Sequence, residues 1–212
     1  MSIDIINELL ASFKAFNYES FTSSLKQAQV KNANGTEILK ALEGAMSDLC
    51  GCYENRELSV AHLCAAGGLF QLAHEYLKSQ NPVKGKAIIC TMGSVHYGGK
   101  NIVKWLMAAN GYEMIDIGEN VSPDRVVESV AEFKPDLVCM SAALVICLPL
   151  QAQAIQMLKA HNMRDSIKVL IGGGVTSQAW ADRIGADGWA KNGPEAVREA
   201  DRVLGELRGG RP

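Results

Sequence analysis

The sequence has no marked excess of charge of either sign, few aromatic residues and no long apolar run. Its 212 residues carry 21 Lys and Arg against 23 Asp and Glu, which gives a formal net charge of −2. This balance argues against the basic surface that nucleic acids and anionic membranes attract. No apolar stretch approaches the roughly 20 residues of a transmembrane helix. We therefore expect no nucleic-acid partner and no membrane partner.

The sequence also lacks the features of a secreted protein. Its first residues, Met1-Ser-Ile-Asp-Ile-Ile-Asn-Glu8, are acidic and amphipathic, unlike a signal peptide. Six cysteines without secretory features predict reduced thiols and a cytoplasmic location. Cys50-Gly-Cys52 is the only close pair, and without a second pair it is a weak metal signal. We interpret all six as core or surface thiols.

Apolar residues at helical spacing in the first 80 residues predict four helices joined by short turns, which is a helical bundle. Asn34-Gly35 indicates a turn, and we expect Thr36 and Ser59 to cap the third and fourth helices. Residues 1–81 are thus expected to form a bundle domain that ends at Asn81-Pro82, followed by a linker over 82–85. The expected inward-facing residues are Ile3, Ile6, Leu9, Leu10 and Phe13, then Phe21, Leu25 and Ala28, then Ile38, Leu42, Ala45, Met46 and Leu49, and finally Leu63, Ala66, Leu69, Phe70, Ala73 and Leu77.

From residue 86 the pattern changes to strand–helix alternation, repeated five times. Short apolar strands between helices predict a parallel sheet that is covered on both faces. Five such units favour a flavodoxin-like (Rossmann-like) five-stranded α/β domain over 86–212, with strand order 2-1-3-4-5. A ligand site is then expected where the loops after strands 1 and 3 meet. The expected strands are 86–91, 113–117, 137–141, 168–172 and 188–190, and the expected helices are 99–109, 123–134, 149–161, 177–184 and 194–207.

The loop after the first expected strand contains three glycines and one histidine. Gly93, Gly98 and Gly99 allow the backbone to approach a large, flat ligand. His96 projects beyond the carboxyl end of the strand, where open α/β sheets bind ligands. The residues alone leave two interpretations open, a ligand-binding loop or a glycine-rich turn with an incidental polar histidine.

Three short elements occur in order along the α/β region. They are Ser94-Val-His96-Tyr-Gly-Gly99, Ser141-Ala-Ala143 after the third expected strand, and Gly172-Gly173 after the fourth. The chain thereby resembles the cobalamin-binding family that includes the B12 module of methionine synthase and the corrinoid proteins of anaerobic methyltransferase systems. The pattern of that family is Asp-x-His-x-x-Gly, then Ser-x-Leu, then Gly-Gly. The resemblance covers essentially the whole chain, because those corrinoid proteins also begin with a helical bundle.

The resemblance implies a cobalamin cofactor (B12 or a related corrinoid) with His96 as its lower cobalt ligand, a role that suits imidazole. It also implies that the displaced nucleotide tail runs beside the sheet, near Ser141 and past Gly172-Gly173. The helical bundle is implied to cap the upper face, around residues 53–63. The implied cofactor-binding residues are Gly93, Ser94, Val95, His96, Tyr97, Gly98, Gly99, Ser141, Ala143, Val145, Cys147, Gly172, Gly173 and Gly174.

This chain departs from the family pattern at several positions. Ser94 stands where the family has an Asp that orients the histidine, and a serine cannot store a proton as that carboxylate can. Ala143 replaces the Leu of Ser-x-Leu, and Val145-Ile-Cys147 replaces a polar run. His62 occupies a cap position where relatives usually have Glu, although it also fits an ordinary amphipathic helix. These departures leave cofactor binding expected and put the standard methyl-carrier cycle in question.

The resemblance implies a protein that carries a methyl group on cobalt between a substrate-specific methyltransferase and an acceptor enzyme. It would be a subunit of a methyltransferase system rather than a complete enzyme. The alternative is a cobalamin sensor or storage protein, but related photoreceptor regulators have a tryptophan in the helical cap. Here Trp105, Trp180 and Trp189 all lie in the second domain, and the first 80 residues leave no room for a DNA-binding domain. A mutase role is weaker because the chain has no substrate barrel.

Overall fold

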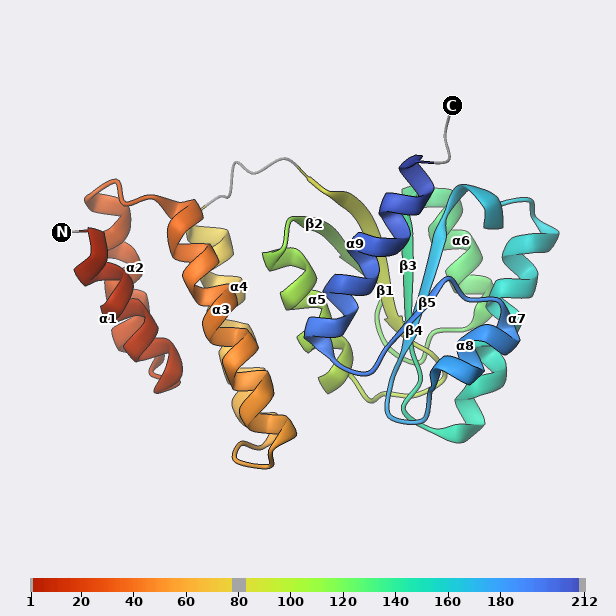
Figure 1. The fold of residues 1–212 in the computed structure, drawn as a ribbon, viewed down its shortest axis with the longest axis horizontal. Coiled ribbons are helices and arrows are strands. Elements are labelled where there is room, and N and C mark those ends of the chain that lie inside the picture. The colour runs from red at the N-terminus through yellow and green to blue at the C-terminus, as the bar shows by residue number, and fades with distance from the viewer. Residues whose placement is uncertain (1, 78–82, 210–212) are drawn as a thin grey trace. The chain divides into compact units, whose positions relative to one another are not determined.

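The computed structural model describes residues 2–77 and 83–209 (Figure 1). Contacts between residues divide the chain into two compact units, residues 1–82 and 83–212. The first unit is helical and the second is α/β, which confirms the predicted fold class. The predicted bundle end at Asn81-Pro82 lies outside the described residues.

The described part of the first unit contains four helices, α1 (Ser2–Lys14), α2 (Tyr18–Val30), α3 (Gly35–Glu54) and α4 (Val60–Leu77). They fold together because each has one apolar stripe that must leave water. In α1 the buried residues include Ile5, Leu9 and Phe13, whereas Ile6 is only partly buried. The predicted stripe is confirmed at Leu9 and Phe13, Ile5 was not predicted, and the side chain of Ile3 lies outside the described residues. Phe13 and Phe21 join α1 to α2 with ring centroids 5.8 Å apart.

The start of α3 also differs from the prediction. Asn34 is its N-cap, and its side-chain oxygen accepts hydrogen bonds from the backbone N–H groups of Thr36 and Glu37, at 3.1 and 3.4 Å. Thr36 already lies inside the helix, so the prediction that it caps this helix was wrong. Asn34 can take this role because an extended asparagine places its short amide acceptor over the first turn.

The second unit contains a five-stranded parallel sheet with the order β2-β1-β3-β4-β5, as predicted. Its strands are β1 (Gly85–Thr91), β2 (Tyr112–Asp116), β3 (Leu137–Ser141), β4 (Lys168–Gly172) and β5 (Gly188–Ala190). Its α-helices are α5 (Gly98–Ala109), α6 (Pro123–Phe133), α7 (Leu148–Ala160), α8 (Gln178–Ile184) and α9 (Gly193–Gly209). Two 3-10 turns that were not predicted, η1 (Val145–Cys147) and η2 (Arg164–Ser166), precede α7 and β4.

The described part of the expected linker belongs to the α/β unit. The backbone N–H of Lys84 donates to the carbonyl of Gly111 at 2.8 Å, and its ammonium pairs with Asp201 at 3.0 Å. Gly85 is already the first residue of β1. The α/β structure therefore begins slightly earlier than residue 86, because Lys84 finds both a backbone and a charged partner.

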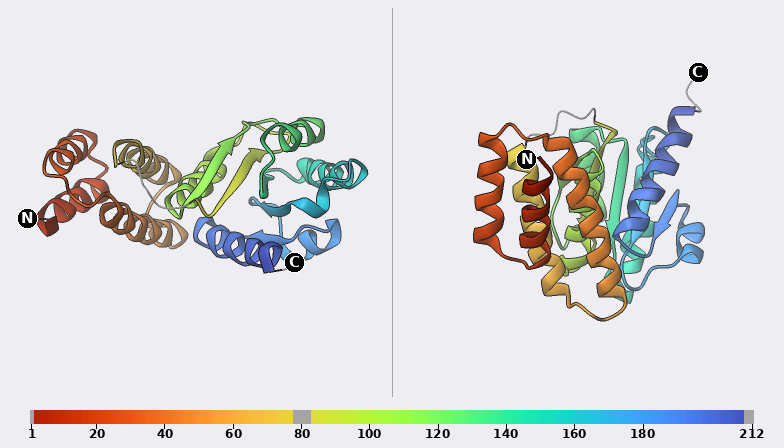
Figure 2. Two further views of the ribbon diagram at one scale, coloured as in Figure 1. Left: turned by 90° about the horizontal axis from the view of Figure 1, so that it is seen from above. Right: turned by 60° about the vertical axis from the view of Figure 1, so that its left-hand side comes forward.

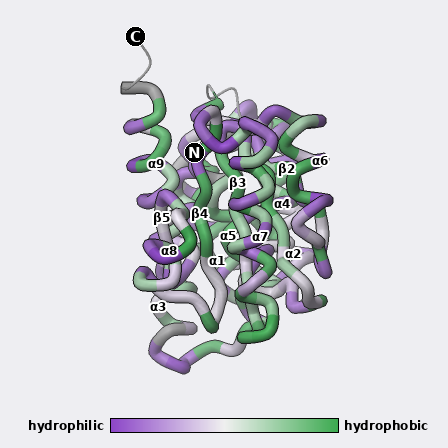
Figure 3. Tube along the Cα trace, turned by 90° about the vertical axis from the view of Figure 1, so that its right-hand side faces the viewer, coloured by the Kyte–Doolittle hydropathy of each residue, from purple (hydrophilic) through white to green (hydrophobic). Residues whose placement is uncertain are grey.

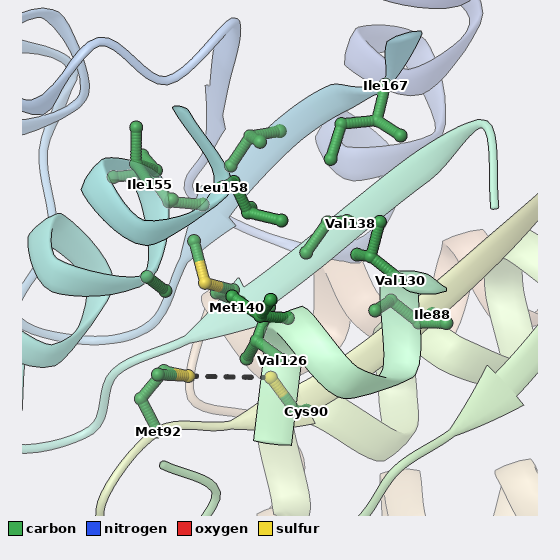
Figure 4. Packing of buried hydrophobic residues seen from close by; sticks show 14 of the residues in the cluster. Ile88, Cys90, Met92, Val126, Val130, Val138, Met140, Ile155, Leu158 and Ile167 are labelled. Carbon is green, nitrogen blue, oxygen red and sulfur yellow. Dashed lines mark hydrogen bonds between the residues drawn. The ribbon is translucent and has the colours of Figure 1, made fainter. Parts of the chain in front are cut away.

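Helices cover both faces of the sheet. Helices α5 and α9 pack against each other on one face, and α6, α7 and α8 lie on the other (Figure 2). Strands β3 and β4 are hydrophobic along most of their length (Figure 3). Under α6 and α7 the core includes Ile88, Val138 and Met140, packed against Ile155 and Leu158 (Figure 4). A sheet buried on both faces explains why its strands read as continuous apolar runs.

Two of the core cysteines lie on adjacent strands of this sheet. Cys90 on β1 and Cys139 on β3 are both buried. Burial raises the pKa of the Cys90 thiol, and it raises that of Cys139 to about 12. A thiol that stays protonated at neutral pH is a poor nucleophile and a poor metal ligand. For these two residues, the interpretation as core thiols is confirmed.

Candidate functional site

The predicted site residues lie at the carboxyl ends of the strands or in the loops that directly follow them. Thr91, Ser141, Gly172 and Ala190 are aligned across β1, β3, β4 and β5. The loops after β1, β3 and β4 therefore leave the sheet at the same edge, the lower end in Figure 1. Hydrogen bonds join neighbouring loops. The N–H of Met92 donates to Ser141 at 2.8 Å, and that of Ala142 donates to Gly172 at 2.9 Å.

The loop after β1, residues 92–97, presents side chains to solvent. Val95, His96 and Tyr97 are all exposed. Gly93 bends the chain with a φ of +59°, and a Cβ there would lie 2.4 Å from Leu150 and 3.3 Å from the sulfur of Cys147. The turn therefore requires glycine both for its conformation and for space. Gly98 and Gly99 already belong to α5, and a Cβ at Gly99 would meet no protein atom within 4 Å, so the space beside Gly99 is open.

Ser94 is the unusual polar residue of this loop. Its side chain is buried, and its hydroxyl oxygen has no hydrogen-bond partner among the described residues. Its backbone is held, since its carbonyl accepts a hydrogen bond from the N–H of Asn120 at 2.8 Å. A buried hydroxyl without a partner is costly and usually indicates a missing ligand, water or function.

The loop after β3 adds an apolar surface at the same edge. Leu144, Val145 and Ile146 are exposed, and Ile146 is 81% accessible. Ser141 and Ala143 are partly buried. Cys147 points the other way, since its side chain is buried beside Gly93. The exposed hydrophobic residues of the β1 and β3 loops together provide an apolar surface for a ligand, which soluble proteins seldom leave uncovered.

The loop after β4 presents backbone rather than side chains. Gly173 has a φ of +109°, and a Cβ there would lie 2.1 Å from the carbonyl oxygen of Ala142. At Gly172 a Cβ would lie 3.1 Å from the carbonyl oxygen of Ala190, whereas at Gly174 it would meet nothing within 4 Å. Gly173 lets the β4 loop lie directly against the β3 loop, and Gly174 leaves open space beside it.

The structure adds residues that hold the loops and that the sequence did not indicate. The hydroxyl of Thr91 donates to the carbonyl of His96 at 3.1 Å. The buried amide of Gln151 donates to the carbonyl of Met140 at 2.9 Å and accepts a hydrogen bond from the indole N–H of Trp180 at 3.0 Å. The buried ammonium of Lys100 pairs with Asp116 and Glu119, which are themselves partly exposed. Thr91 could have been found from the sequence, because it ends its strand as Ser141 does. The other contacts join segments that share no motif.

Asp116 is the charged group at the end of β2. Burial disfavours its ionised form, but hydrogen bonds from Lys100, Lys104 and the N–H of Gly118 prevail and lower the pKa of this carboxyl. Asp116 therefore stays ionised at neutral pH and compensates the buried lysine.

His62 lies in the other unit, and its observed contacts are structural. The backbone N–H of Ser59 donates to His62 Nδ1 at 3.1 Å, and the Ser59 hydroxyl lies 2.8 Å from the same nitrogen. A side chain in the first turn of a helix that accepts the N–H of the preceding cap residue makes one of the two hydrogen bonds of a capping box. This arrangement supports the ordinary helix interpretation of His62 and confirms Ser59 at the start of α4.

The chemistry of these loops fits a large cofactor that brings its own metal ligands. Among residues 2–77 and 83–209, no group of three or more His, Cys, Asp or Glu side chains could hold a metal ion. His96 thus offers a single imidazole, beside an apolar surface, an unpartnered hydroxyl and a glycine-lined space. A corrinoid would bring the other ligands of its cobalt, and a single imidazole from the protein would be enough to hold the metal from one side, so these residues fit it. In the same described ranges, no helix has the length and apolarity needed to cross a membrane.

Comparison with known proteins gives a consistent result. Residues 86–200 match the family model described as a B12 binding domain. The chain is 31% identical over 208 residues to dimethylamine corrinoid protein 1 of Methanosarcina acetivorans, covering 95% of this chain and 98% of that protein. It is 43% identical over 129 residues to a corrinoid protein of Desulfitobacterium hafniense strain Y51, covering 60% of each chain.

Solved structures extend this similarity to the fold of both units. A cobalamin-binding protein from Desulfitobacterium hafniense DCB-2 superposes with a TM-score of 0.73 at 26% identity, covering 93% of this chain and 97% of that chain. These relatives do not favour the alternative of a sensor or storage protein. With three B12-type motif elements on adjacent loops and a family model that spans the α/β unit, the chain belongs to the B12-binding family, among its corrinoid proteins.

Proposed function

We propose that this chain is the corrinoid-carrying subunit of a methyltransferase system. The observation that carries the proposal is the gathering of the β1, β3 and β4 loops at one edge of the sheet, with an exposed imidazole on one and a glycine-lined space on another. The corrinoid, when bound, supplies a cobalt centre that can accept a methyl group and release it. The chain itself contributes binding, orientation and exclusion of water.

His96 is the proposed lower ligand to cobalt. Its ring is exposed, while its backbone is held by the hydroxyl of Thr91. Val95, Tyr97 and Val145 are placed to contact the macrocycle, since their apolar groups are otherwise exposed at this edge. Burial of such surface stabilises a complex by about 25 cal/mol per Å².

The nucleotide tail is proposed to lie between the β3 and β4 loops. Ser141 offers a partly buried hydroxyl there, and Gly172, Gly173 and Gly174 keep the passage free of side chains. Any larger residue at Gly173 would press on the carbonyl of Ala142. Ala143 and Cys147 support the β3 loop, and the burial of Cys147 makes it a supporting rather than a contacting residue.

Ser94 is proposed to orient His96 without adding a negative charge. Its unpartnered hydroxyl is two residues from the imidazole and can accept one hydrogen bond from a ring N–H. A neutral partner strengthens the donor nitrogen less than a carboxylate does. Ligation by His96 should therefore be weaker than in a relative with Asp at this position.

A methyl donor and a methyl acceptor must both reach the cobalt, so the expected partners are a methyltransferase and an acceptor enzyme. The names of the dimethylamine relatives make a methylamine the first methyl donor to test, together with its methyltransferase. We also infer a cytoplasmic location, supported by the sequence features described above.

The proposal predicts that the protein takes up hydroxocobalamin in about one-to-one ratio and retains it through gel filtration. After reduction, addition of a methylamine and its methyltransferase should produce the absorption spectrum of a methylated corrinoid. Retention of the cofactor without methylation by any methylamine methyltransferase would contradict the donor assignment. Failure to retain any corrinoid would contradict the proposed function itself.

A further inference from the structure

A buried lysine lies in the first turn of the helix that follows the His96 loop. Lys100 is 1% exposed, and its ammonium contacts both carboxylate oxygens of Asp116, at 2.5 and 2.6 Å. It also lies 2.9 Å from a carboxylate oxygen of Glu119. Burying an ammonium ion is costly unless charged partners surround it, so this cluster is maintained against a desolvation penalty.

The two acidic partners connect Lys100 to the segment that supports the His96 loop. Asp116 ends β2, and Glu119 lies in the following segment, residues 117–121. That segment pairs with the end of β1 through backbone hydrogen bonds. The N–H of Val121 donates to Thr91 at 3.0 Å, the N–H of Gly93 donates to Val121 at 3.2 Å, and the N–H of Asn120 donates to Ser94 at 2.8 Å.

Together with the chain itself, these contacts form a closed ring that contains His96. The chain runs from Gly93 through His96 to Lys100, and Lys100 reaches through space to Glu119. From there the backbone hydrogen bonds return to the start of the loop. Both ends of the His96 loop are thus attached to one short segment, at one end by backbone groups and at the other by Lys100.

Lys104 provides a built-in comparison within the same helix. Its ammonium also pairs with Asp116, at 2.9 Å, but 23% of its side chain is exposed. Its ion pair within the described residues is with Asp116 and does not extend to Glu119. Lys104 therefore shares the charge environment of Lys100 without tying α5 to the 117–121 segment.

We propose that Lys100 is a positioning residue that fixes the His96 loop through Asp116 and Glu119. By limiting the positions of the backbone around His96, it favours the arrangement in which the imidazole binds cobalt. The inference rests on the proposed role of His96 as the lower ligand. None of the three charged residues needs to touch the cofactor.

The anchoring can be tested first in the cofactor-free protein by amide hydrogen exchange. In Glu119→Gln and Lys100→Met, the amides of Gly93, Asn120 and Val121 should exchange about tenfold faster than in the wild type. In Lys104→Met they should stay within about twofold of the wild-type rates. Glu119→Gln leaves the Lys100–Asp116 pair in place, so it decides the question even if Lys100→Met does not fold. Unchanged exchange in Glu119→Gln would overturn the proposal.

The consequence for the ligand is tested with the Co(II) corrinoid bound. Electron paramagnetic resonance reports the fraction of cobalt that carries a nitrogen ligand from histidine. Loss of the anchor should weaken His96 ligation about tenfold in Glu119→Gln and Lys100→Met, a size typical of residues that support metal ligands. Lys104→Met should retain the wild-type fraction. Equal losses in all three variants would show a general charge effect and overturn the positioning role.

His96→Ala separates this inference from the proposed function. If a nitrogen signal that changes on ¹⁵N labelling of histidine persists, His96 is not the ligand and the proposed site is wrong, while the exchange experiment still decides whether Lys100 anchors the loop. If the signal disappears but Glu119→Gln and Lys100→Met match the wild type in both experiments, the site stands and the positioning role of Lys100 is refuted.

Discussion

The loops after β1 and β4 lie at the same edge of the sheet but are held by different chemistry. The β1 loop presents exposed side chains, and its neighbourhood is anchored by the charged cluster of Lys100, Asp116 and Glu119. The β4 loop presents backbone, and neutral contacts hold it. Thr176 donates to the carbonyl of Gly173 at 2.7 Å and accepts a hydrogen bond from the indole of Trp189 at 2.9 Å.

The two loops therefore have different roles at the site. A loop that supplies a metal ligand must aim one side chain, so its backbone has to be fixed from outside. A loop that makes room for a ligand must exclude side chains, and close backbone packing at Gly173 achieves this. Substitutions should therefore affect the β1 loop mainly by changing charge interactions and the β4 loop mainly by changing steric contacts.

The largest expected effect is steric and lies in the β4 loop. Gly173→Ala adds a Cβ at a φ of +109° and against the carbonyl oxygen of Ala142, which should lower the free energy of unfolding by about 3 kcal/mol. Gly174→Ala is the matched control, since its Cβ meets nothing within 4 Å, and it should change stability by less than about 0.5 kcal/mol. Urea denaturation measures both. Equal stability of the two variants would show that the loop relaxes.

The next effect should distinguish the charged anchor from the neutral one by its pH dependence. The pKa of Asp116 is lowered in the folded state, so its ionisation stabilises the protein above about pH 4 and this contribution is lost as the pH falls through the lowered value. Asp116→Asn should cost about 2 kcal/mol at pH 7, because Lys100 loses its main partner. Its difference from the wild type should shrink below about pH 4.

Thr176→Val provides the neutral counterpart of this measurement. It removes the hydroxyl between Gly173 and Trp189 and should cost about 1 kcal/mol. No titrating group is removed, so the cost should be the same at pH 7 and at a pH well below 4, where Asp116 becomes protonated. A pH-dependent cost for Thr176→Val, or a constant one for Asp116→Asn, would contradict the assignment of charge to one loop and neutral contacts to the other.

Much of the fold could be predicted because its signals are local. The bounds of β3, β4 and β5 and the strand order follow from short apolar runs between helices, and Ser122 caps α6 as its position before Pro123 indicates. The cap of α3 was predicted wrongly because two residues that can cap a helix lie close together in the sequence. Asn34 rather than Thr36 caps α3, because a cap is chosen by backbone conformation as well as by residue type.

The candidate site could be predicted in its exposed parts and less well in its supports. His96 and the glycines stand in a short motif, so the sequence alone indicated them. Lys100 and Asp116 are 16 positions apart and meet only after α5 packs on the sheet. In the sequence, Lys100 is one of many helix lysines, and nothing local shows that it is buried. The inward direction of Cys147 likewise depends on the η1 turn, which has no strong sequence signal.

The smallest expected effect concerns Ser94. Its hydroxyl is buried and has no hydrogen-bond partner within residues 2–77 and 83–209, so Ser94→Ala should leave the stability of the cofactor-free protein unchanged or raise it by up to about 1 kcal/mol. Thermal denaturation of the two proteins without corrinoid measures this. A clear loss of stability in Ser94→Ala would mean that the hydroxyl already has a partner before the cofactor binds.

The central claim is that His96 holds the cobalt of a bound corrinoid. The most direct measurement is the electron paramagnetic resonance spectrum of the Co(II)-loaded protein, prepared with ¹⁵N-labelled histidine and compared with unlabelled protein and with His96→Ala. We predict superhyperfine splitting from one imidazole nitrogen, a change from three lines to two on labelling, and no label-sensitive splitting in His96→Ala. Splitting in the wild type that ignores the label, or label-sensitive splitting that survives His96→Ala, would contradict the account.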